Sequence, residues 1–194
     1  RSLTQTDPLE SNNGHSEQPL NKDSEYKGDR ISGKNQSTIR LGFININGVP
    51  QDNDDEKNQH LLETINQYSF DHVGIAEANC NWSQIYQDHR WYERTKTWWE
   101  CHKSTIAYNK KDILQEAHQR GGTISVSIGK IVHKITDSGA DEVLGRWSWQ
   151  TMTGVNGIKS TFITGYRPSN NTNGGVESTY FQHARIYSIQ QREG

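Results

Sequence analysis

T-I-R-L-G-F-I-N-I-N-G-V at residues 38–49 and D-H-V-G-I-A-E-A-N at residues 71–79 are two short β-rich runs. The first ends in an Asn-Gly pair, which predicts a strand followed by a turn, and the second ends in a carboxylate. We expect a helix over residues 57–68 between them, and so a β-α-β unit whose strands are neighbours in one sheet. Four apolar side chains of this segment recur at helical spacing: Leu61, Leu62, Ile65 and Tyr68.

Polar side chains stand where each strand of this unit ends. Asn45 closes the first strand and Glu77 closes the second. If the strands lie side by side, both side chains emerge at the same edge of the sheet, and Mg²⁺ prefers such oxygen ligands, usually with only one or two protein carboxylates. The structural alternative is that Asn45 and Asn47 are turn residues and Glu77 is a solvated strand end. Spacing alone leaves both interpretations open.

Three motifs of the chain resemble a known family. N-I-N-G at residues 45–48 and I-A-E-A at 75–78 are similar to the first two motifs of the endonuclease/exonuclease/phosphatase family, above all in the apurinic-type endonuclease domains of non-LTR retrotransposons. G-Y-R-P-S-N at residues 165–170 is similar to a later strand end of the family, although by itself it is more typical of a strand-end Tyr before a proline turn. The resemblance covers roughly residues 38 to 190.

The resemblance implies a role for each matching residue. Asn45 and Glu77 are expected to help hold the metal, Mg²⁺ or Mn²⁺, and the scissile phosphate. Tyr166 is expected to place its hydroxyl near that phosphate. Asn47 falls where many relatives have Asp or Asn, and Arg167 is a candidate phosphate contact that the motif does not require.

The implied fold is a four-layer α/β sandwich of two sheets with helices outside, truncated to its first half to two-thirds. The implied activity is metal-dependent phosphodiester hydrolysis, the nicking of DNA, and the implied partners are DNA and a reverse transcriptase domain in the same polyprotein. Two alternatives stay open. One is a phosphomonoesterase of the same fold, acting on inositol phosphates or sphingolipid, and the other is a non-catalytic module that binds nucleic acid or protein.

Two later motifs of the family are absent from the sequence. A Gly-Asp-Phe-Asn strand end and a Ser-Asp-His segment do not occur. The resemblance assigns to them the orientation of the attacking water and the stabilisation of the transferring phosphate. We therefore expect residues 38–194 to be a partial domain with little or no activity by itself, so that whether this chain is an enzyme stays open. We also expect it to leave an apolar sheet face uncovered, with poor solubility or dimerisation as the result.

Composition limits the remaining possibilities. With 194 residues, 30% hydrophobic residues and a mean hydropathy of -0.96, the chain holds one modest domain, and its net charge of -2 restricts nucleic-acid contacts to local patches. Cys80 and Cys101 are expected to be free thiols in a reducing compartment. No apolar run approaches a membrane span, so the expected location is intracellular, with the nucleus as one option.

Three further segments carry expectations. Residues 1–37 are too polar to order and predict a disordered leader. The acidic loop at residues 51–56 suits a helix cap better than a calcium loop. The Trp- and Tyr-rich stretch at residues 79–100 is expected to pack the core, with base stacking as the alternative and with one or two of its cations near the substrate.

The later part of the chain predicts more strands. Residues 121–129 alternate Thr or Ser with Ile or Val, which is typical of a half-buried strand. Residues 145–152 and 159–166 form an expected antiparallel hairpin, and residues 136–142 an expected loop. A helix is expected over residues 180–189.

Overall fold

The computed structural model describes residues 31, 33–110 and 116–166. The chain divides into two units, Arg1–Ser32 and Gly33–Gly194, and the elements below all belong to the second. Most of the expected leader, the expected helix over residues 180–189 and Arg167 lie outside the described residues, so those expectations stay predictions.

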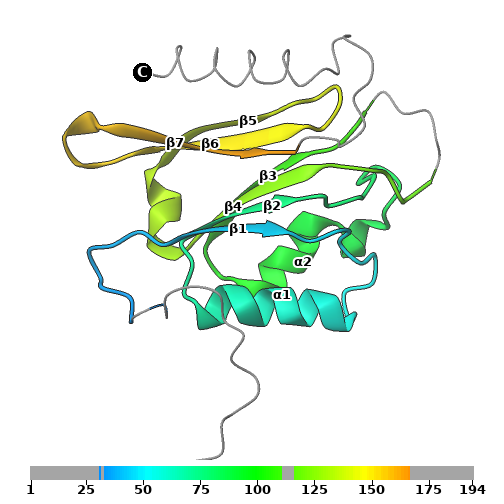
Figure 1. The fold of residues 1–194 in the computed structure, drawn as a ribbon, viewed down its shortest axis with the longest axis horizontal. Helices are drawn as coiled ribbons and strands as arrows, with labels where there is room; N and C mark the ends of the chain where they lie inside the picture. Colours follow the sequence, from blue (N-terminus) through cyan, green and yellow to red (C-terminus); the bar gives the residue numbers. More distant parts are fainter. Residues whose placement is uncertain (1–30, 32, 111–115, 167–194) are drawn as a thin grey trace, which may run out of the picture. The chain divides into compact units, whose positions relative to one another are not determined.

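The expected β-α-β unit forms the start of a four-stranded sheet. Strands β1 and β2 run parallel, with Asn45 paired to Ala76, and helix α1 connects them. Strand β4 is antiparallel to both β2 and β3, which gives the order β1-β2-β4-β3 (Figure 1). The bounds of these elements are β1 Leu41–Asn45, α1 Glu56–Gln67, β2 His72–Ala76, β3 His102–Ala107 and β4 Thr123–Ile128.

The acidic loop before α1 caps that helix, as expected. Asp55 is the N-cap residue, and its Oδ1 accepts a hydrogen bond from the backbone N–H of Lys57 at 2.8 Å. Glu56 follows in the first turn, where a negative charge interacts favourably with the helix dipole.

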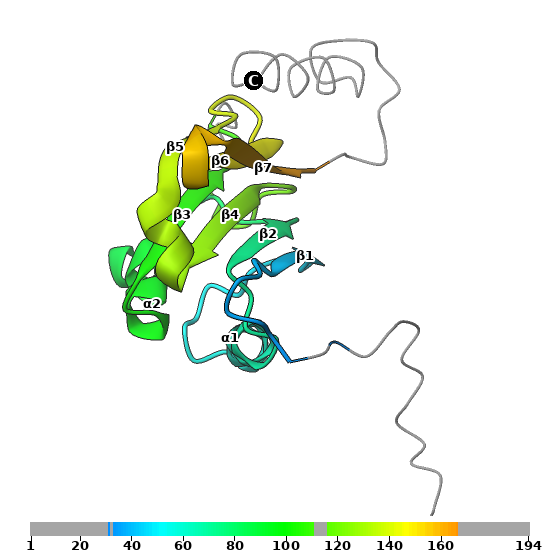
Figure 2. The same ribbon diagram turned by 90° about the vertical axis from the view of Figure 1, so that its left-hand side faces the viewer.

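Two helices cover one face of the first sheet and enclose the main core. Helix α2 (Trp91–Trp98), which the sequence did not indicate, lies beside α1 on this face (Figures 1 and 2). Trp82, Trp91 and Trp99 are buried, and Trp82 meets Trp91 edge to face with ring centroids 6.3 Å apart. The expectation that these aromatic residues pack the core is confirmed for all three.

A second sheet of three antiparallel strands packs on the other face (Figure 2). Its strands are β5 Ile135–Ala140, β6 Trp147–Thr153 and β7 Lys159–Gly165. The expected hairpin of β6 and β7 is confirmed, and Asn156 and Gly157 turn it with φ of 63° and 76°. The expected loop at residues 136–142 is wrong, because most of it is β5, whose I-T-D-S-G-A sequence lacks apolar alternation and is ordered by pairing with β6.

Polar side chains, rather than apolar ones, join the two sheets. Ser125 Oγ of β4 lies 3.0 Å from Ser148 Oγ of β6 and 2.9 Å from Thr164 Oγ1 of β7. Ser127 donates to Gln150 Oε1 at 2.6 Å. The expectation that β4 is half exposed is therefore wrong, since its serines face the second sheet and are fully buried. We call Ser125, Ser127, Ser148, Gln150 and Thr164 the polar layer.

The polar layer satisfies its own hydrogen bonds and needs a close approach of the strands. Gln150 Nε2 donates to the carbonyl of Lys103 at 2.9 Å and to that of Ser125 at 3.1 Å. A Cβ on Gly74 would collide with the Thr164 side chain, so glycine lets β7 approach β2. Buried polar groups that are all paired avoid the penalty of about 1–3 kcal/mol for each unpaired one.

The chain thus supplies strands of both sheets, and the face of the first sheet that was expected to stay uncovered is covered by β6 and β7 through the polar layer. Helices, first sheet and second sheet are three of the four expected layers, and the mixed α/β two-sheet fold class is confirmed. The fourth layer would lie on the outer face of β6, where Trp147 and Trp149 are half-buried.

The two cysteines are free, as expected. Cys80 is buried and donates to the carbonyl of Val49 at 3.2 Å, and burial raises the pKa of its thiol to about 11. No helix in the described part of the chain is long and apolar enough to cross a membrane.

His72 should make stability depend on pH. It is buried against Phe162, its Nδ1 lies 2.9 Å from Ser127 Oγ, and burial lowers its pKa from 6.5 to about 4. As the pH falls below 6.5, His72 becomes protonated in the unfolded chain, whereas in the folded chain it stays neutral until about pH 4. The free energy of unfolding should therefore fall by up to about 3 kcal/mol across this window because of His72 alone, and stay constant above it.

Urea unfolding at several pH values measures this effect. His72→Asn should flatten the slope between pH 6.5 and pH 4, whereas His60→Gln, at a side chain that is 66% exposed, should leave it unchanged. An equal slope in wild type and His72→Asn would contradict the prediction.

Candidate functional site at the strand ends

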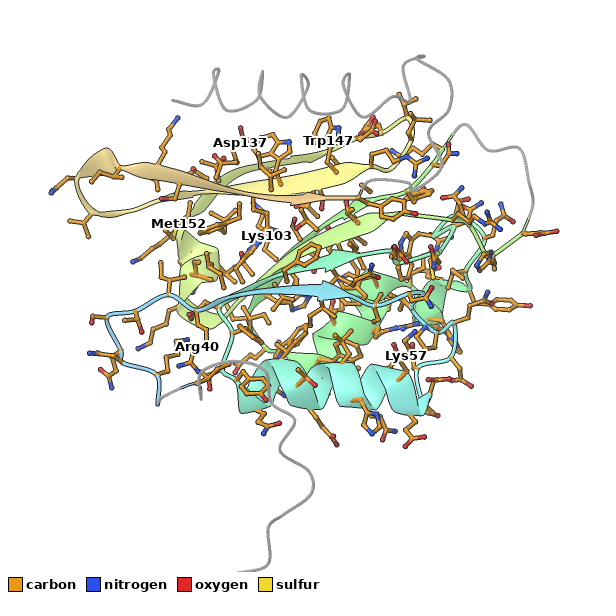
Figure 3. The ribbon with its side chains drawn as sticks, viewed as in Figure 1. Arg40, Lys57, Lys103, Asp137, Trp147 and Met152 are labelled. Atoms are coloured by element: carbon orange, nitrogen blue, oxygen red, sulfur yellow. The ribbon has the colours of Figure 1, made fainter. Side chains whose placement is uncertain are left out.

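Three strands of the first sheet end, and the fourth begins, at the same edge of the sheet. The register aligns Asn45 with Ala76, and both Ala76 and Ala107 with Thr123, so β1, β2 and β3 end where β4 begins. Figure 3 shows Lys57 and Trp147 toward this end of the molecule and Arg40 and Met152 toward the other. We call this end the site edge, defined by Asn45, Asn47, Glu77, Asn79, Gly121 and Tyr166.

Asn45 and Glu77 meet at the site edge. Asn45 Nδ2 donates to Glu77 Oε1 at 3.0 Å, and Asn45 Oδ1 accepts the backbone N–H of Asn47 at 3.2 Å. The backbone N–H of Gly48 also donates to the Glu77 carbonyl at 2.7 Å. The structure therefore brings together the amide and the carboxylate that the sequence placed at two strand ends, and it holds the Asn45 side chain at both of its polar atoms.

Left-handed backbone is concentrated here. Asn47, Glu77 and Asn79 have φ of 47°, 56° and 52°. Asn tolerates this region, whereas Glu has no local compensation, so the conformation of Glu77 costs about 1–2 kcal/mol. Such strain persists where surrounding contacts impose it, and it collects at functional sites. The hydrogen bond from Asn45 Nδ2 to Oε1 orients the Glu77 carboxylate.

Asn79 and Gly121 connect the end of β2 to Tyr166. Asn79 Oδ1 accepts the backbone N–H of Gly121 at 2.8 Å, and its own backbone N–H donates to the Gly121 carbonyl at 2.6 Å. Gly121 has a φ of +91°, and a Cβ there would lie 3.0 Å from Tyr166 Cε1. Tyr166 therefore lies against the turn that Asn79 holds, on the same edge as Glu77.

Arg146 is a cation of this edge that the sequence reasoning missed. Its guanidinium carbon lies 5.4 Å from the Tyr166 ring centroid, and its carbonyl accepts the Tyr166 backbone N–H at 2.7 Å. The buried Asp141 accepts the backbone N–H groups of Val143 and Arg146 at 3.1 and 3.2 Å and so orders the turn before β6. In the sequence, the only signal for Arg146 is that it directly precedes β6, the strand expected to pair with the strand that ends at Tyr166.

Arg94 has a structural role, so it is not one of the one or two cations of residues 79–100 that were expected near the substrate; that expectation stays a prediction for the others. It is buried, and it donates to the carbonyls of Pro50 and His89, both at 2.9 Å, and to Asn58 Oδ1 at 2.9 Å. Burial lowers the pKa of its guanidinium. Arg94 thereby holds the loop that follows Asn47.

The site edge offers some of the oxygen ligands that a hard divalent cation prefers. Asn45 and Glu77 offer amide and carboxylate oxygens, and Glu77 Oε2 accepts no hydrogen bond from a described residue. Within residues 33–110 and 116–166 no group of three His, Cys, Asp or Glu gathers at one place. One carboxylate is compatible with Mg²⁺, which keeps several waters.

Comparison with solved structures agrees with this architecture. An endonuclease/exonuclease/phosphatase family protein from Leptotrichia buccalis C-1013-b matches with a TM-score of 0.50 and 14% identity, over 81% of this chain and 64% of that one. An AP endonuclease from Archaeoglobus fulgidus matches with a TM-score of 0.47 and 13% identity, over 81% and 52%. No family profile matches the sequence, and a search of curated proteins finds no match.

The likeness to the Leptotrichia protein concerns the fold alone. The two-sheet α/β architecture is that of the endonuclease/exonuclease/phosphatase proteins. The chain spans about half to two-thirds of the length of these two structures.

Asn79 offers a test of how the site edge is held. Asn79→Ala should lower the free energy of unfolding by about 2 kcal/mol. The substitution removes the hydrogen bond to Gly121, and alanine tolerates the left-handed φ of 52° less well than asparagine does. Asn79→Gly should lose less, since glycine adopts this φ freely. Urea unfolding of both variants measures the difference, and an Ala variant as stable as wild type would refute this account.

Proposed function

We propose that the site edge is the cation- and phosphate-binding part of a metal-dependent phosphodiesterase that acts on DNA. The observation that carries the proposal is the contact between Asn45 Nδ2 and Glu77 Oε1 at the ends of two parallel strands, with Glu77 held at a strained φ. The three-motif resemblance and the fold support it. The AP endonuclease among the similar structures is compatible with DNA as the substrate.

Each residue has a chemical role in this proposal. Glu77 Oε2 and Asn45 Oδ1 are the oxygens that would hold Mg²⁺ or Mn²⁺, and a cation there supplies charge neutralisation at a phosphate oxygen. Tyr166 donates its hydroxyl proton in a hydrogen bond to the phosphate, and Arg146 beside it adds positive charge. Asn47 lines the same edge, and Arg167 remains a proposed phosphate contact.

The groups that would orient water are not assigned within this chain. We propose that such groups belong to the Gly-Asp-Phe-Asn and Ser-Asp-His motifs of a longer product, which as in the resembling retroelements would carry a reverse transcriptase domain and act in the nucleus. The chain by itself then binds metal and DNA and nicks DNA little. A non-catalytic module would also bind DNA, but its affinity would not depend on Glu77 or on metal.

Metal binding tests the proposal directly. Titration calorimetry with Mn²⁺ should detect one site on the chain, and Glu77→Gln should weaken it by about tenfold or more, because it removes the only carboxylate of the set. Glu63→Gln, at an exposed position of α1, is the matched control and should bind as wild type does.

DNA binding separates the two candidate functions. Fluorescence anisotropy with a labelled duplex should show affinity that falls when EDTA removes the metal, and Glu77→Gln should abolish this dependence. If DNA affinity is the same with and without metal and in Glu77→Gln, the non-catalytic module is the correct function. Equal Mn²⁺ affinity of wild type and Glu77→Gln would refute the metal site.

A further inference from the structure

An irregularity in the pairing of β2 with β4 lies directly beside the site edge. Ala76 pairs with Thr123, and beyond the ends of these strands Cys80 pairs with His118. Between these two pairs, residues 77–79 face residues 119–122, which is three residues against four. The extra residue makes this a β-bulge, a feature that often redirects a side chain next to a functional site.

Two consecutive glycines and one asparagine build the bulge. Gly121 and Gly122 have φ of 91° and 84°, which residues with a Cβ rarely adopt. The carbonyl of Asn79 accepts the backbone N–H of Gln119 at 3.0 Å, and its Oδ1 accepts that of Gly121 at 2.8 Å. Both neighbours of Arg120 are thus hydrogen-bonded to the segment that follows β2.

Gln119 holds the bulge from its other side. Its side chain is buried, with Oε1 accepting the backbone N–H of Asn109 at 2.8 Å and Nε2 donating to the Asn109 carbonyl at 2.6 Å. Neighbouring strands of a sheet lie about 5 Å apart. The backbone of Arg120 is therefore fixed about one strand spacing from the segment that carries Glu77 and Asn79.

The side chain of Arg120 is exposed and unpaired. Its guanidinium has no ion pair and no hydrogen bond with another residue of the described part of the chain. Two lysines near this edge are engaged instead: Lys110 pairs with Glu142 at 3.6 Å, and Lys57 donates to the Asn47 carbonyl at 3.0 Å. Arg120 is therefore a cation on a fixed backbone that stays available to a ligand.

Arg146 brings a second guanidinium to the bulge. A Cβ on Gly121 would lie 3.2 Å from Arg146 Nη1 and 3.0 Å from Tyr166 Cε1. Positive charge therefore gathers on the β4 side of Glu77. The net charge of -2 makes nucleic-acid contacts depend on such local concentrations of cations. A guanidinium binds phosphate through two parallel N–H···O hydrogen bonds.

We propose that Arg120 binds a backbone phosphate of the DNA strand that crosses the site edge, and so positions that strand over Glu77. The inference rests on the proposed function, because it takes DNA as the ligand, and it adds a substrate-binding residue outside the three resembling motifs. Asn79 and Gln119 fix the backbone from which the side chain extends, which lowers the entropy that phosphate binding costs.

The salt dependence of DNA affinity tests this assignment. Fluorescence anisotropy with a labelled duplex and Mn²⁺ is measured at several KCl concentrations. Arg120→Ala should weaken binding by about tenfold and reduce the slope of log K against log salt concentration by about 1, because one phosphate contact is lost.

Two matched variants serve as controls. Arg120→Lys should keep the slope and lose only about threefold in affinity, since lysine retains the charge without the planar fork. Lys130→Ala removes the same charge at an exposed residue beyond the opposite end of β4, and it should bind DNA as wild type does. Arg120→Ala should also unfold at the same urea concentration as wild type, because its side chain has no partner among the described residues.

The outcomes separate this inference from the proposed function. If Arg120→Ala binds DNA with the affinity and slope of wild type, or if Lys130→Ala lowers the slope equally, the inference is wrong while the metal site is unaffected. If wild-type affinity is the same with and without metal, the proposed phosphodiesterase is wrong, and a lower slope in Arg120→Ala still places Arg120 on the DNA. A wild-type chain that does not bind DNA would overturn both.

Discussion

The hydrogen bonds between Ser125, Ser148 and Thr164 fix one sheet on the other, and the site edge depends on that alignment. Ser125 sits in the middle of β4, and its two partners lie one residue inside the ends of β6 and β7. Directional contacts of this kind set the register of the two sheets in a way that apolar packing does not. Tyr166 and Arg146 consequently reach the edge at which β1 and β2 end.

The same edge combines strain with support. Glu77 adopts a left-handed conformation that its side chain does not favour, and it does so between the backbone bond from Gly48 and the turn that Asn79 fixes to Gly121. The buried guanidinium of Arg94 holds the loop on the other side. These hydrogen bonds stabilise the strained backbone of Glu77, and the bond from Asn45 orients its carboxylate in the absence of a ligand.

Local signals in the sequence were sufficient for the first half of this picture. Helical spacing in α1, the strand ends at Asn45 and Glu77, and the Asn-Gly turn between β6 and β7 each depend on neighbours in the chain, and the structure has all three. These signals gave the β-α-β unit and the meeting of amide and carboxylate. Whether those residues bind metal stays a prediction.

Features that depend on distant contacts were not predictable from the sequence. The serines of β4 alternate as solvent-facing residues do, so nothing local shows that they face Gln150 and Ser148. Strand β5 has no apolar pattern from which it could be recognised. It is ordered instead by its pairing with β6. Arg146 and Asn79 became site residues only through contacts with Tyr166 and Gly121, which lie 20 and 42 positions away in the sequence.

Anomalous diffraction from crystals of the chain grown with Mn²⁺ shows whether Asn45 and Glu77 hold a divalent cation, as we propose. We expect an anomalous peak at about 2.1 Å from a Glu77 oxygen and from Asn45 Oδ1, and its loss in Glu77→Gln. Crystals that contain Mn²⁺ at other positions, with none at this edge, would contradict the proposal.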